Sequence, residues 1–456
     1  MQRPEALVRR HNKRHDGTMI APSLAKTAYP PSYWAASGQP FTERPALAGA
    51  TDSDVVIIGA GYTGLSAALH LAKRGMKVTV LESARVGWGA SGRNGGLLIP
   101  GQRNDAETLI ATHGPDHAKR LFTLALEGRD LLARLVADNA IACDLQFNGY
   151  VHAALTPAAA KACAHEVDRL QNIMGYAHVA ALSAEEIRSH VASPRYQGGL
   201  LDRQGGHLHP LNFALGLAKA AERAGATIHE HSAVIRLEEG SATTAHTAFG
   251  SVKARFAIIA NDAFVANVDL KLGAWVMPVG NCLIATEPLG NFLSTLLPTK
   301  AAVSDTKFVL DYFRPTTDGR LVFGGGERYT PGDPPDIAAF VRPYLTKVFP
   351  QLASIRFTQA WSGTVSVTRS RNPCFGRRGN LYWAIGYSGL GVIMATLGGA
   401  LIAEAVRGTA DRFDVMAKLP GEPWPGGPLA RDPLYVAGML WYALRDRIGL
   451  SLSGQG

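Results

Sequence analysis

The chain has 456 residues, of which 46% are hydrophobic and 18% are charged, and its formal net charge is +9. This length allows two or three domains with separate cores, and the composition is that of an ordinary soluble protein. The positive charge is dispersed outside a basic N-terminal stretch and is not interleaved with stacking aromatic residues, so we expect no nucleic-acid partner. The 4 cysteines are widely spaced and form no CxxC pair, which argues for a reducing compartment and against a structural zinc site.

Residues 1–53 have no clear periodicity and several prolines, which predicts an extended arm. Tyr29, Tyr33 and Trp34 are placed to pin this arm to the body of the protein. The beginning of the chain is polar and basic, without the apolar segment of a secretory signal, and no run of about 18 apolar residues is uninterrupted. We therefore expect a cytoplasmic protein without an integral membrane segment.

Residues 54–82 have the pattern of a dinucleotide-binding βαβ unit. A short apolar strand, residues 55–58, leads into a glycine turn and then into a helical pattern. A second strand, residues 77–81, ends at Glu82, whose carboxylate is placed to accept hydrogen bonds from ribose hydroxyls. The unit predicts a cofactor that contains ADP.

The glycines of this unit have separate physical roles. Gly59 permits a tight turn, Gly61 lets the backbone approach a pyrophosphate, and Gly64 allows close packing of the helix on the strand. Tyr62 and Thr63 lie at the start of the helix, where free N–H groups and the positive end of the dipole suit phosphates. This spacing leaves NAD and FAD equally open.

A glycine-rich segment, residues 83–103, follows the acidic residue directly. It is too rich in glycine for a regular element, and its position predicts a loop that runs along the cofactor away from the ADP end. Its candidate donors and close-approach positions are Ser91, Arg93, Asn94, Gly95 and Gly96.

Residues 105–195 are rich in Ala and Leu at helical spacing, for example in 118–136 and 158–174, and indicate a helical insertion. Cys163, His165 and Glu166 could suggest a metal site, but their place on an amphipathic helix favours a solvated face, and we expect no metal.

The pattern then returns to α/β. Residues 212–224 form a helical pattern, and the strand region 227–238 crosses Val234. A short apolar strand, residues 256–260, ends at Asn261, and the carboxyl end of such a strand is where ligands bind in an α/β sheet. Asn261 is therefore a cofactor-binding candidate.

Residues 276–326 are rich in strands, and the alternation in 308–313 indicates a half-buried antiparallel sheet. A helix is predicted at 337–349. The candidates for the substrate pocket are polar residues of this region and of the glycine loop before the 212–224 helix, with roles in positioning rather than bond making. They are His207, His209, Tyr312, Arg314 and Arg328.

A second glycine-rich turn between a strand and a helix occurs late in the chain. Strands at 357–368 and 381–385 precede it, and a helix follows from near Val392. A cofactor domain assembled from both ends of the chain would explain this late position. The cofactor-binding candidates of this turn are Gly386, Ser388, Gly389, Leu390, Gly391 and Val392. A Pro/Gly linker and an amphipathic stretch, residues 435–450, complete a tail that begins at residue 411.

As a set, several motifs resemble those of the D-amino-acid-oxidase-like flavoproteins, and within them the gamma-glutamylputrescine oxidoreductase branch. The resemblance rests on PSYWAAS, VVIIGAGYTGLSAALHL, GWGASGRNGG, GGHLHPLNFALGLA, MPVGNCLIATEPL, DTKFVLDYFRPTTDGRLVFGGGE, GYSGLGV and GMLWYALRDR. It implies FAD, held by a discontinuous Rossmann-like domain of residues 54–104, 195–265 and 357–410. Residues 105–194 and 266–356 would then form a substrate domain on a mixed or antiparallel sheet with helices, so that the fold class is α/β, or α+β overall. The resemblance also implies that Val234 touches the adenine side through its backbone.

Three positions depart from patterns of this family. Leu390 stands where the late turn usually has a histidine, which removes a polar ring near the flavin. Gly363 stands where members with covalent flavin have a cysteine, so we expect dissociable FAD. Val365 stands where members that oxidise amino acids often have a carboxylate-binding arginine, which favours an amine over a small α-amino acid.

The leading hypothesis is an FAD-dependent amine oxidase or dehydrogenase. Its substrate would be a gamma-glutamylated diamine or a related primary or secondary amine, and its electron acceptor O2 or another carrier. The flavin would accept a hydride from the carbon next to the nitrogen, and the imine would hydrolyse to an aldehyde. Two alternatives stay open, the oxidation of a cyclic imino acid such as pipecolate or proline and a flavin-binding partner or sensor without turnover.

Overall fold

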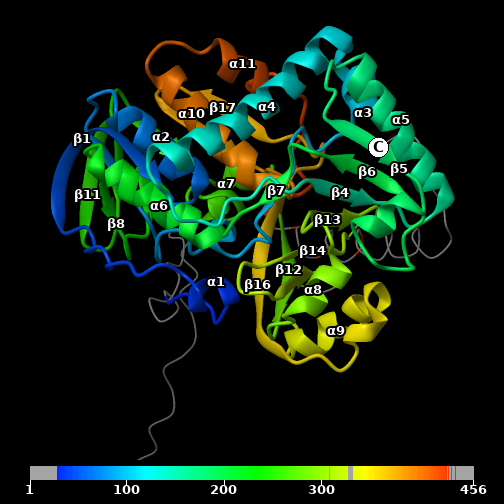
Figure 1. Cartoon of the computed structure of the whole chain (residues 1–456). Helices are drawn as coiled ribbons and strands as arrows, with labels where there is room; N and C mark the ends of the chain where they lie inside the picture. The colour runs from blue at the N-terminus through cyan, green and yellow to red at the C-terminus, as the bar shows by residue number, and fades with distance from the viewer. Residues whose placement is uncertain are drawn as a thin grey trace, which may run out of the picture.

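The computed structural model describes residues 28–307, 309–326 and 332–428, together with Ala430, Pro433 and Ala437. Its strands form two large sheets, which lie on opposite sides of the molecule (Figure 1). A small ribbon of β3 (Leu97–Leu98) and β7 (Gly206–His207) connects the loops near the centre. The amphipathic stretch predicted at residues 435–450 lies outside the described residues except for Ala437.

The first sheet has the order β17-β18-β11-β1-β2-β8, with β10 and β9 added beside β11. The pairs along β18-β11-β1-β2-β8 are parallel, whereas β17, β10 and β9 pair antiparallel. The strands are β1 (Gly49–Ile58), β2 (Val78–Leu81), β8 (Thr227–His229), β9 (Arg236–Glu238), β10 (Thr243–His246), β11 (Gly250–Ile259), β17 (Cys374–Arg378) and β18 (Leu381–Ile385). Because β11 pairs with both β1 and β18, distant parts of the chain form one sheet.

Three helices pack together against this sheet, namely α2 (Tyr62–Ala72), α6 (Pro210–Arg223) and α10 (Gly391–Val406). Helix α10 is buried along almost its whole length, and small residues let it approach α2 closely. A Cβ added at Gly399 would lie 2.3 Å from the carbonyl oxygen of Thr63. This close contact fixes the early and late helices relative to each other, and Figure 1 shows α2 and α10 next to each other beside the first sheet.

The second sheet has the order β16-β12-β15-β14-β13-β4-β6-β5 and is antiparallel except for the pair of β13 and β4. Its strands are β4 (Tyr150–Ala153), β5 (Val179–Leu182), β6 (Gly199–Asp202), β12 (Met277–Thr286), β13 (Ala302–Asp305), β14 (Tyr312–Pro315), β15 (Leu321–Gly324) and β16 (Phe357–Val367). The predicted fold class, a Rossmann-like sheet with helices and a second, mostly antiparallel sheet, is confirmed.

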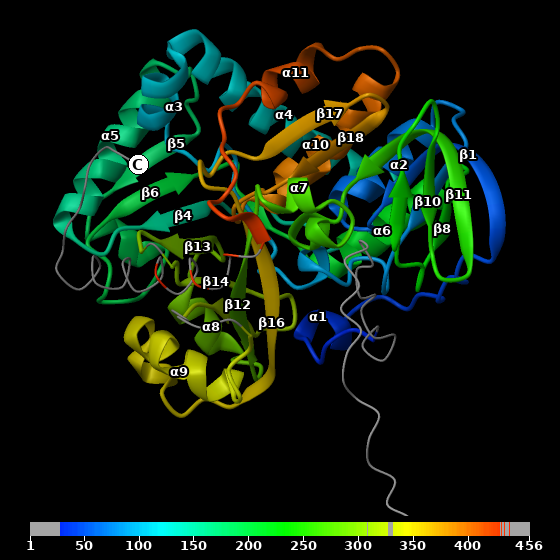
Figure 2. The same cartoon turned by 180° about the vertical axis from the view of Figure 1, so that it is seen from behind.

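Helices α8 (Asn291–Leu296) and α9 (Ile337–Val348) lie near β12, β14 and β16 (Figure 2). Phe313, Phe323 and Phe349 are fully buried in the core of this region. Helices α3 (Ala106–His113), α4 (Pro115–Asp138) and α5 (Pro157–Asn172) surround the other end of the sheet. The remaining helices are short and are α1 (Tyr33–Ala36), α7 (Leu270–Gly273) and α11 (Asp411–Ala417).

Several elements differ from the sequence-based expectations. The region 105–195 is not wholly helical, because β4 and β5 lie between its helices and join the second sheet. The alternation predicted at 308–313 is not one strand, since β13 ends at Asp305 and β14 begins only at Tyr312. Periodicity failed here because these strands are too short to show alternation. Strand β1 begins at Gly49, within the segment predicted as an arm.

The segment before β1 is tied to the body by aromatic side chains. The Tyr29 hydroxyl donates to the carbonyl of Val86, and the indole N–H of Trp34 donates to the carbonyl of Asn94. The Tyr33 hydroxyl donates to Asp318 of the second sheet region. These three residues are the ones the sequence indicated. In the described part of the chain, no helix combines the length and apolar character that crossing a membrane requires.

Candidate active site

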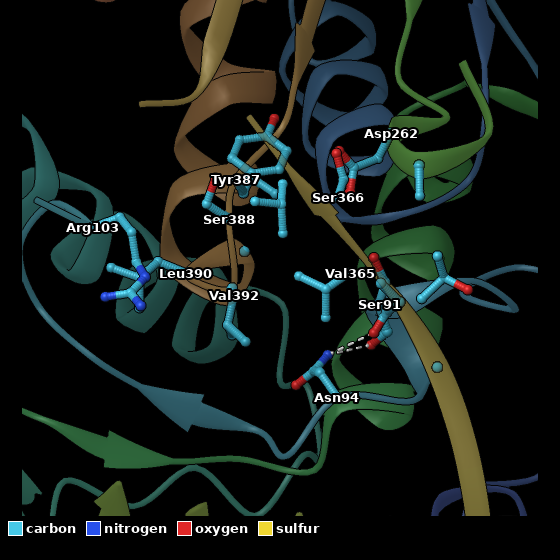
Figure 3. A pocket seen from close by; sticks show the side chains of 18 of the residues that line it. Ser91, Asn94, Arg103, Asp262, Val365, Ser366, Tyr387, Ser388, Leu390 and Val392 are labelled. Carbon is cyan, nitrogen blue, oxygen red and sulfur yellow. Dashed lines mark hydrogen bonds between the residues drawn. The ribbon is translucent and has the colours of Figure 1, made fainter. Parts of the chain in front are cut away.

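A cavity of about 1390 Å³ is lined by residues from both sheets and from both glycine-rich turns. Small-molecule sites usually measure about 300–1,000 Å³, so this cavity has room for a dinucleotide together with a second ligand. Figure 3 shows side chains around it from three segments. These are the glycine-rich segment 83–103, here called the early loop, strand β16, and the glycine-rich turn of residues 386–391, here called the late turn.

The glycine turn between β1 and α2, residues 59–61, brings backbone groups to the wall of the cavity. Gly59 has φ +106°, and an added Cβ would lie 2.8 Å from the carbonyl oxygen of Ala260 on the neighbouring strand. A Cβ at Gly61 would lie 2.9 Å from Ser91 Oγ. The N-cap residue of α2, Gly61, supplies no side-chain cap, and Tyr62 N donates to Ser91 Oγ at 3.0 Å. The positive dipole end of the helix lies at the cavity, which Tyr62 and Thr63 line. This arrangement suits a pyrophosphate.

Glu82 lies at the end of β2 and also lines the cavity. Its carboxylate accepts hydrogen bonds from the backbone N–H groups of Ala60 at 2.7 Å and Ala84 at 2.9 Å. These bonds hold the carboxylate still, and burial raises its pKa. An ionised carboxylate has about four lone-pair sites, so acceptor positions remain for ribose hydroxyls. Val234, in the loop between β8 and β9, also lines the cavity.

The early loop is held in shape by its own polar side chains. Asn94 Nδ2 donates to the carbonyls of Ala90 at 2.9 Å and Ser91 at 3.1 Å, and Asn94 Oδ1 accepts from Gly96 N at 2.7 Å (Figure 3). Arg93 Nε donates to the carbonyl of Trp88 at 2.6 Å, and its guanidinium lies 4.0 Å from the centre of the Trp88 ring. Burial lowers the pKa of Arg93 to about 10, so the side chain is a cation at neutral pH.

The late turn lies opposite, with Ser388 at φ +51° and Gly389 at φ +98° before helix α10. Helix α10 also begins without a side-chain cap. The Tyr387 hydroxyl lies 2.7 Å from Thr63 Oγ1, and Asp262 Oδ1 accepts a hydrogen bond from Gly386 N at 2.8 Å. The two turns and the end of β11 therefore form one connected wall.

One buried polar atom of this wall has no partner among the described residues. Asn261 Nδ2 donates to the carbonyl of Phe264, but Asn261 Oδ1 is buried without a hydrogen bond, and Asn261 lines the cavity. Buried polar atoms are nearly always satisfied, so this oxygen points to a donor on a ligand. Together with the two uncapped helix starts, it fits a bound dinucleotide cofactor.

Most of the predicted cofactor-binding residues line the cavity. These are Gly59, Gly61, Tyr62, Thr63, Glu82, Ser91, Arg93, Asn94, Gly95, Val234, Asn261, Ser388, Gly389, Leu390, Gly391 and Val392. Gly64, Gly96 and Gly386 lie behind the wall, where a Cβ would clash with Gly59, Leu208 and Thr368 respectively. These three glycines shape the turns rather than face the cavity.

Of the predicted substrate-pocket residues on β14, one lines the cavity and the other lies behind it. Tyr312 lines the cavity, packs against Gly95 and donates to Asn281 Oδ1. The buried guanidinium of Arg314 donates to the carbonyls of Gly95 at 2.9 Å, Leu208 at 2.7 Å and Pro315 at 2.9 Å, outside the cavity lining. It holds the early loop against β14. Arg328 lies outside the described residues.

The two histidines also lie outside the cavity lining. His209 caps α6, since its Nδ1 accepts from Asn212 N at 3.1 Å, and its Nε2 lies 3.1 Å from Ser37 Oγ. His207 Nε2 lies 3.2 Å from the carbonyl oxygen of Lys300, to which the ring donates. Burial, and then the charge of Arg314, lower the pKa of each histidine to about 3. Both are therefore neutral at physiological pH.

Several cavity residues were not singled out from the sequence. Arg103, Tyr150 and His152 line one part of it, and Asn281 lies beside Tyr312. The expectation of a solvated helix face at 163–166 was wrong for two residues, since Cys163 is buried and Glu166 lines the cavity. The amphipathic pattern of α5 did not reveal that a second layer, α3, covers this face.

Comparison with known proteins decides the family. Residues 54–405 match the profile of the DAO family, described as FAD dependent oxidoreductase. The chain belongs to this family of FAD-dependent oxidoreductases. The predicted resemblance and the expectation of an FAD-dependent enzyme are thereby confirmed. Gamma-glutamylputrescine oxidoreductase of Escherichia coli strain K12 is a relative with 40% identity over 429 residues, which covers 93% of this chain and 100% of the relative.

Solved structures of other proteins share this fold. Glycine oxidase from Geobacillus kaustophilus superposes with a TM-score of 0.66 at 23% identity, over 78% of this chain and 95% of the other. L-proline dehydrogenase from P. horikoshii gives a TM-score of 0.66 at 21% identity, over 80% of this chain and 98% of the other. At these identities the likeness is one of fold.

Proposed function

We propose that the chain oxidises the C–N bond of a primary or secondary amine, of the gamma-glutamylputrescine type, with dissociable FAD as cofactor. The relative with 40% identity over 93% of the chain supports the substrate type. The observation that carries the choice of an amine is Val365 on β16, an apolar side chain in the cavity wall. The carboxylate of a small α-amino acid, held next to the reacting carbon, would have no cation at that position.

Bound FAD would supply the acceptor for the hydride that leaves the carbon next to the amine nitrogen. The cradle for it would be the two uncapped helix starts with Glu82 at the ribose and Asn261 beside the late turn. Dissociable FAD is supported by Gly363, which lines the cavity in place of a cysteine. Among the described cysteines, none lines the cavity.

The remaining work of the chain is to hold the amine and exclude water. Tyr312, fixed by Asn281 and packed on Gly95, is placed to position the substrate between β14 and the early loop. Arg314 and His209 act from behind by holding that loop and the start of α6 in place, and His207 pairs with Leu97 in the β3–β7 ribbon. The amine binds in its neutral form and loses the hydride and a proton to give an imine, and water then converts the imine to an aldehyde and ammonia or a smaller amine.

An anaerobic substrate panel tests this proposal. The purified yellow protein is mixed without oxygen with gamma-glutamylputrescine, putrescine, pipecolate, proline and glycine, and the flavin absorbance is followed. We expect rapid bleaching by gamma-glutamylputrescine and slow or no bleaching by the amino acids. If pipecolate or proline reduced the flavin faster, the proposed substrate class would be a cyclic imino acid instead of an amine. If no compound reduced the flavin, the result would indicate a flavin-binding protein without turnover. Peroxide formed in air would identify O2 as the acceptor.

The role of Val365 has its own control. Val365→Arg is expected to lower kcat/KM for gamma-glutamylputrescine by more than about tenfold, since an unpaired cation beside the reacting carbon is costly to bury. Val365→Met adds similar length without charge. Equal losses in the two variants would show that only the volume of this side chain matters.

A further inference from the structure

Arg103 is a cation on the cavity wall that has no partner within the described part of the chain. It lies half-buried between β3 and α3 and forms no hydrogen bond or ion pair with any described residue. Two other arginines near the site are engaged, Arg314 with three carbonyls and Arg93 with the carbonyl of Trp88. An unpaired cation that is partly withdrawn from water is unfavourable, so it is typically kept because a ligand supplies the counter-charge.

The acidic residues near Arg103 are engaged with other partners. Asp105 is exposed and caps α3 by accepting from Thr108 N at 2.8 Å. Glu166 accepts from Ala106 N at 2.9 Å, and Asp202 accepts from the Tyr176 hydroxyl at 2.7 Å and from Gln204 N at 2.8 Å. Tyr150 on β4 also lies near Arg103, and its hydroxyl is 2.5 Å from Ser304 Oγ. One of these two hydroxyls donates to the other, so the proton of the second remains available to a ligand.

His152, the second cavity-lining residue of β4, does not compete with Arg103 as a cation. Its Nδ1 lies 3.3 Å from Ser304 Oγ. Burial, and then the charge of Arg103, lower the pKa of His152 to about 4, so the ring is neutral at physiological pH. The positive charge of this part of the cavity therefore comes from Arg103.

Arg103 lies away from the part of the cavity that the early loop and β16 form. Figure 3 shows its side chain on the far side of Leu390 and Val392 from Ser91 and Val365. An anion held by Arg103 would thus lie at a distance from the carbon that is oxidised. The cavity connects both regions, because residues of each line it.

We propose that Arg103 binds a carboxylate at the distal end of the amine substrate and thereby selects amines that carry a remote carboxylate. This inference rests on the proposed amine oxidation. A guanidinium can donate two parallel hydrogen bonds to a carboxylate, and Tyr150 or Ser304 can supply a third donor. One cation with neutral donors matches the single negative charge of a carboxylate better than the double charge of a phosphate.

The test compares two substrates that differ only in this charge, N-glutarylputrescine and its terminal carboxamide. Kinetics of flavin reduction are measured anaerobically for the wild type, Arg103→Met and Arg103→Lys. In Arg103→Met, the preference for the acid over the carboxamide, as a ratio of kcat/KM, should fall about 10- to 100-fold, as for a lost charge-assisted hydrogen bond, mainly through KM. Arg103→Lys should recover part of the preference. Arg188→Met, which removes an exposed charge from another surface, should keep the wild-type ratio.

The outcomes separate this inference from the proposed function. Equal loss with both substrates, or an unchanged ratio in Arg103→Met, would overturn the role of Arg103 while amine oxidation stands. If neither compound reduced the flavin of the wild type, the proposal of amine oxidation would be rejected. Calorimetric titration of both compounds would then decide the role of Arg103. Tighter binding of the acid in the wild type but not in Arg103→Met would support it, and equal binding would overturn it. Flavin content and Tm confirm that each variant is folded.

Discussion

The hydroxyl of Thr63, in the first turn of α2, lies 2.7 Å from the hydroxyl of Tyr387 in the late turn. Both groups are fully surrounded by protein, and the Tyr387 hydroxyl also donates to the carbonyl of Ala384 at 3.0 Å. The pair joins the two glycine turns, which lie far apart in the chain. The cofactor wall thus depends on one buried side-chain contact as well as on the sheet.

Tyr387→Phe removes this contact and leaves the Thr63 hydroxyl buried without its partner. We expect a loss of about 1–3 kcal/mol in the free energy of unfolding and weaker retention of FAD. Urea unfolding and flavin fluorescence during dialysis measure the two effects. Tyr382→Phe is the control, since Tyr382 is a buried residue whose hydroxyl forms no hydrogen bond within the described part of the chain. Equal effects in both variants would mean that the contact contributes nothing specific.

Gly64→Ala tests the close packing of α2 on β1. The added Cβ would lie 2.0 Å from the carbonyl oxygen of Gly59, so the helix must shift away from the turn. We expect a destabilisation of about 1–3 kcal/mol and a loss of bound flavin. Gly240→Ala is matched, because the nearest atom to its Cβ is 3.4 Å away. A Gly64→Ala protein with wild-type Tm and flavin content would contradict the packing argument.

Arg314→Met tests whether this arginine acts through the early loop. Its loss leaves the carbonyls of Gly95 and Leu208 without their donor, so we expect a destabilisation of about 3 kcal/mol together with reduced flavin content. Differential scanning calorimetry and flavin absorbance measure these, and Arg188→Met serves as the exposed control. A variant with wild-type Tm and flavin content but a raised KM would instead show that Arg314 contacts the substrate.

Glu166 makes stability depend on pH. Burial raises its pKa from the ordinary 4.5 to about 7, although its carboxyl accepts a hydrogen bond from Ala106 N. The folded state therefore retains a proton that the unfolded state releases. This contribution is fully present below about pH 4.5 and is lost as the pH rises to about 7.

Glu166→Gln should remove this dependence. Urea midpoints at pH 5 and pH 8 should differ less in the variant than in the wild type, because a glutamine does not titrate. Glu185→Gln, an exposed change at the start of a short turn, should retain the wild-type difference. If Glu166→Gln kept the wild-type difference, another group would be responsible.

The sequence predicted the elements with strong local signals. The unit from β1 to Glu82 and the late turn after β18 were readable because tight turns and close approaches demand glycine at fixed positions. That geometry predicted the close packing of the helix at Gly64 and the position of Glu82 at the end of β2. A resemblance to a known family added the order of the separated segments, which local patterns alone do not give.

Contacts between distant segments were not readable in the same way. Arg314 has the spacing of a pocket residue two positions from Tyr312, yet its side chain holds three carbonyls behind the early loop. Arg103 and Glu166 lie in segments that look like loop and helix surface. They face the cavity only because the helices α3 and α5 close over the second sheet, and single-segment periodicity carries no information about such a layer.

The pairing of β11 with both β1 and β18 has a consequence for folding during synthesis. While the protein is being synthesised, β18, the strand that joins β17 to β11 in the first sheet, is made only after residue 380, and the late turn follows it. A nascent chain that stops short of this point has half of its cofactor wall. Loading of FAD must therefore follow release of most of the chain from the ribosome, and fragments cut before β18 should be colourless.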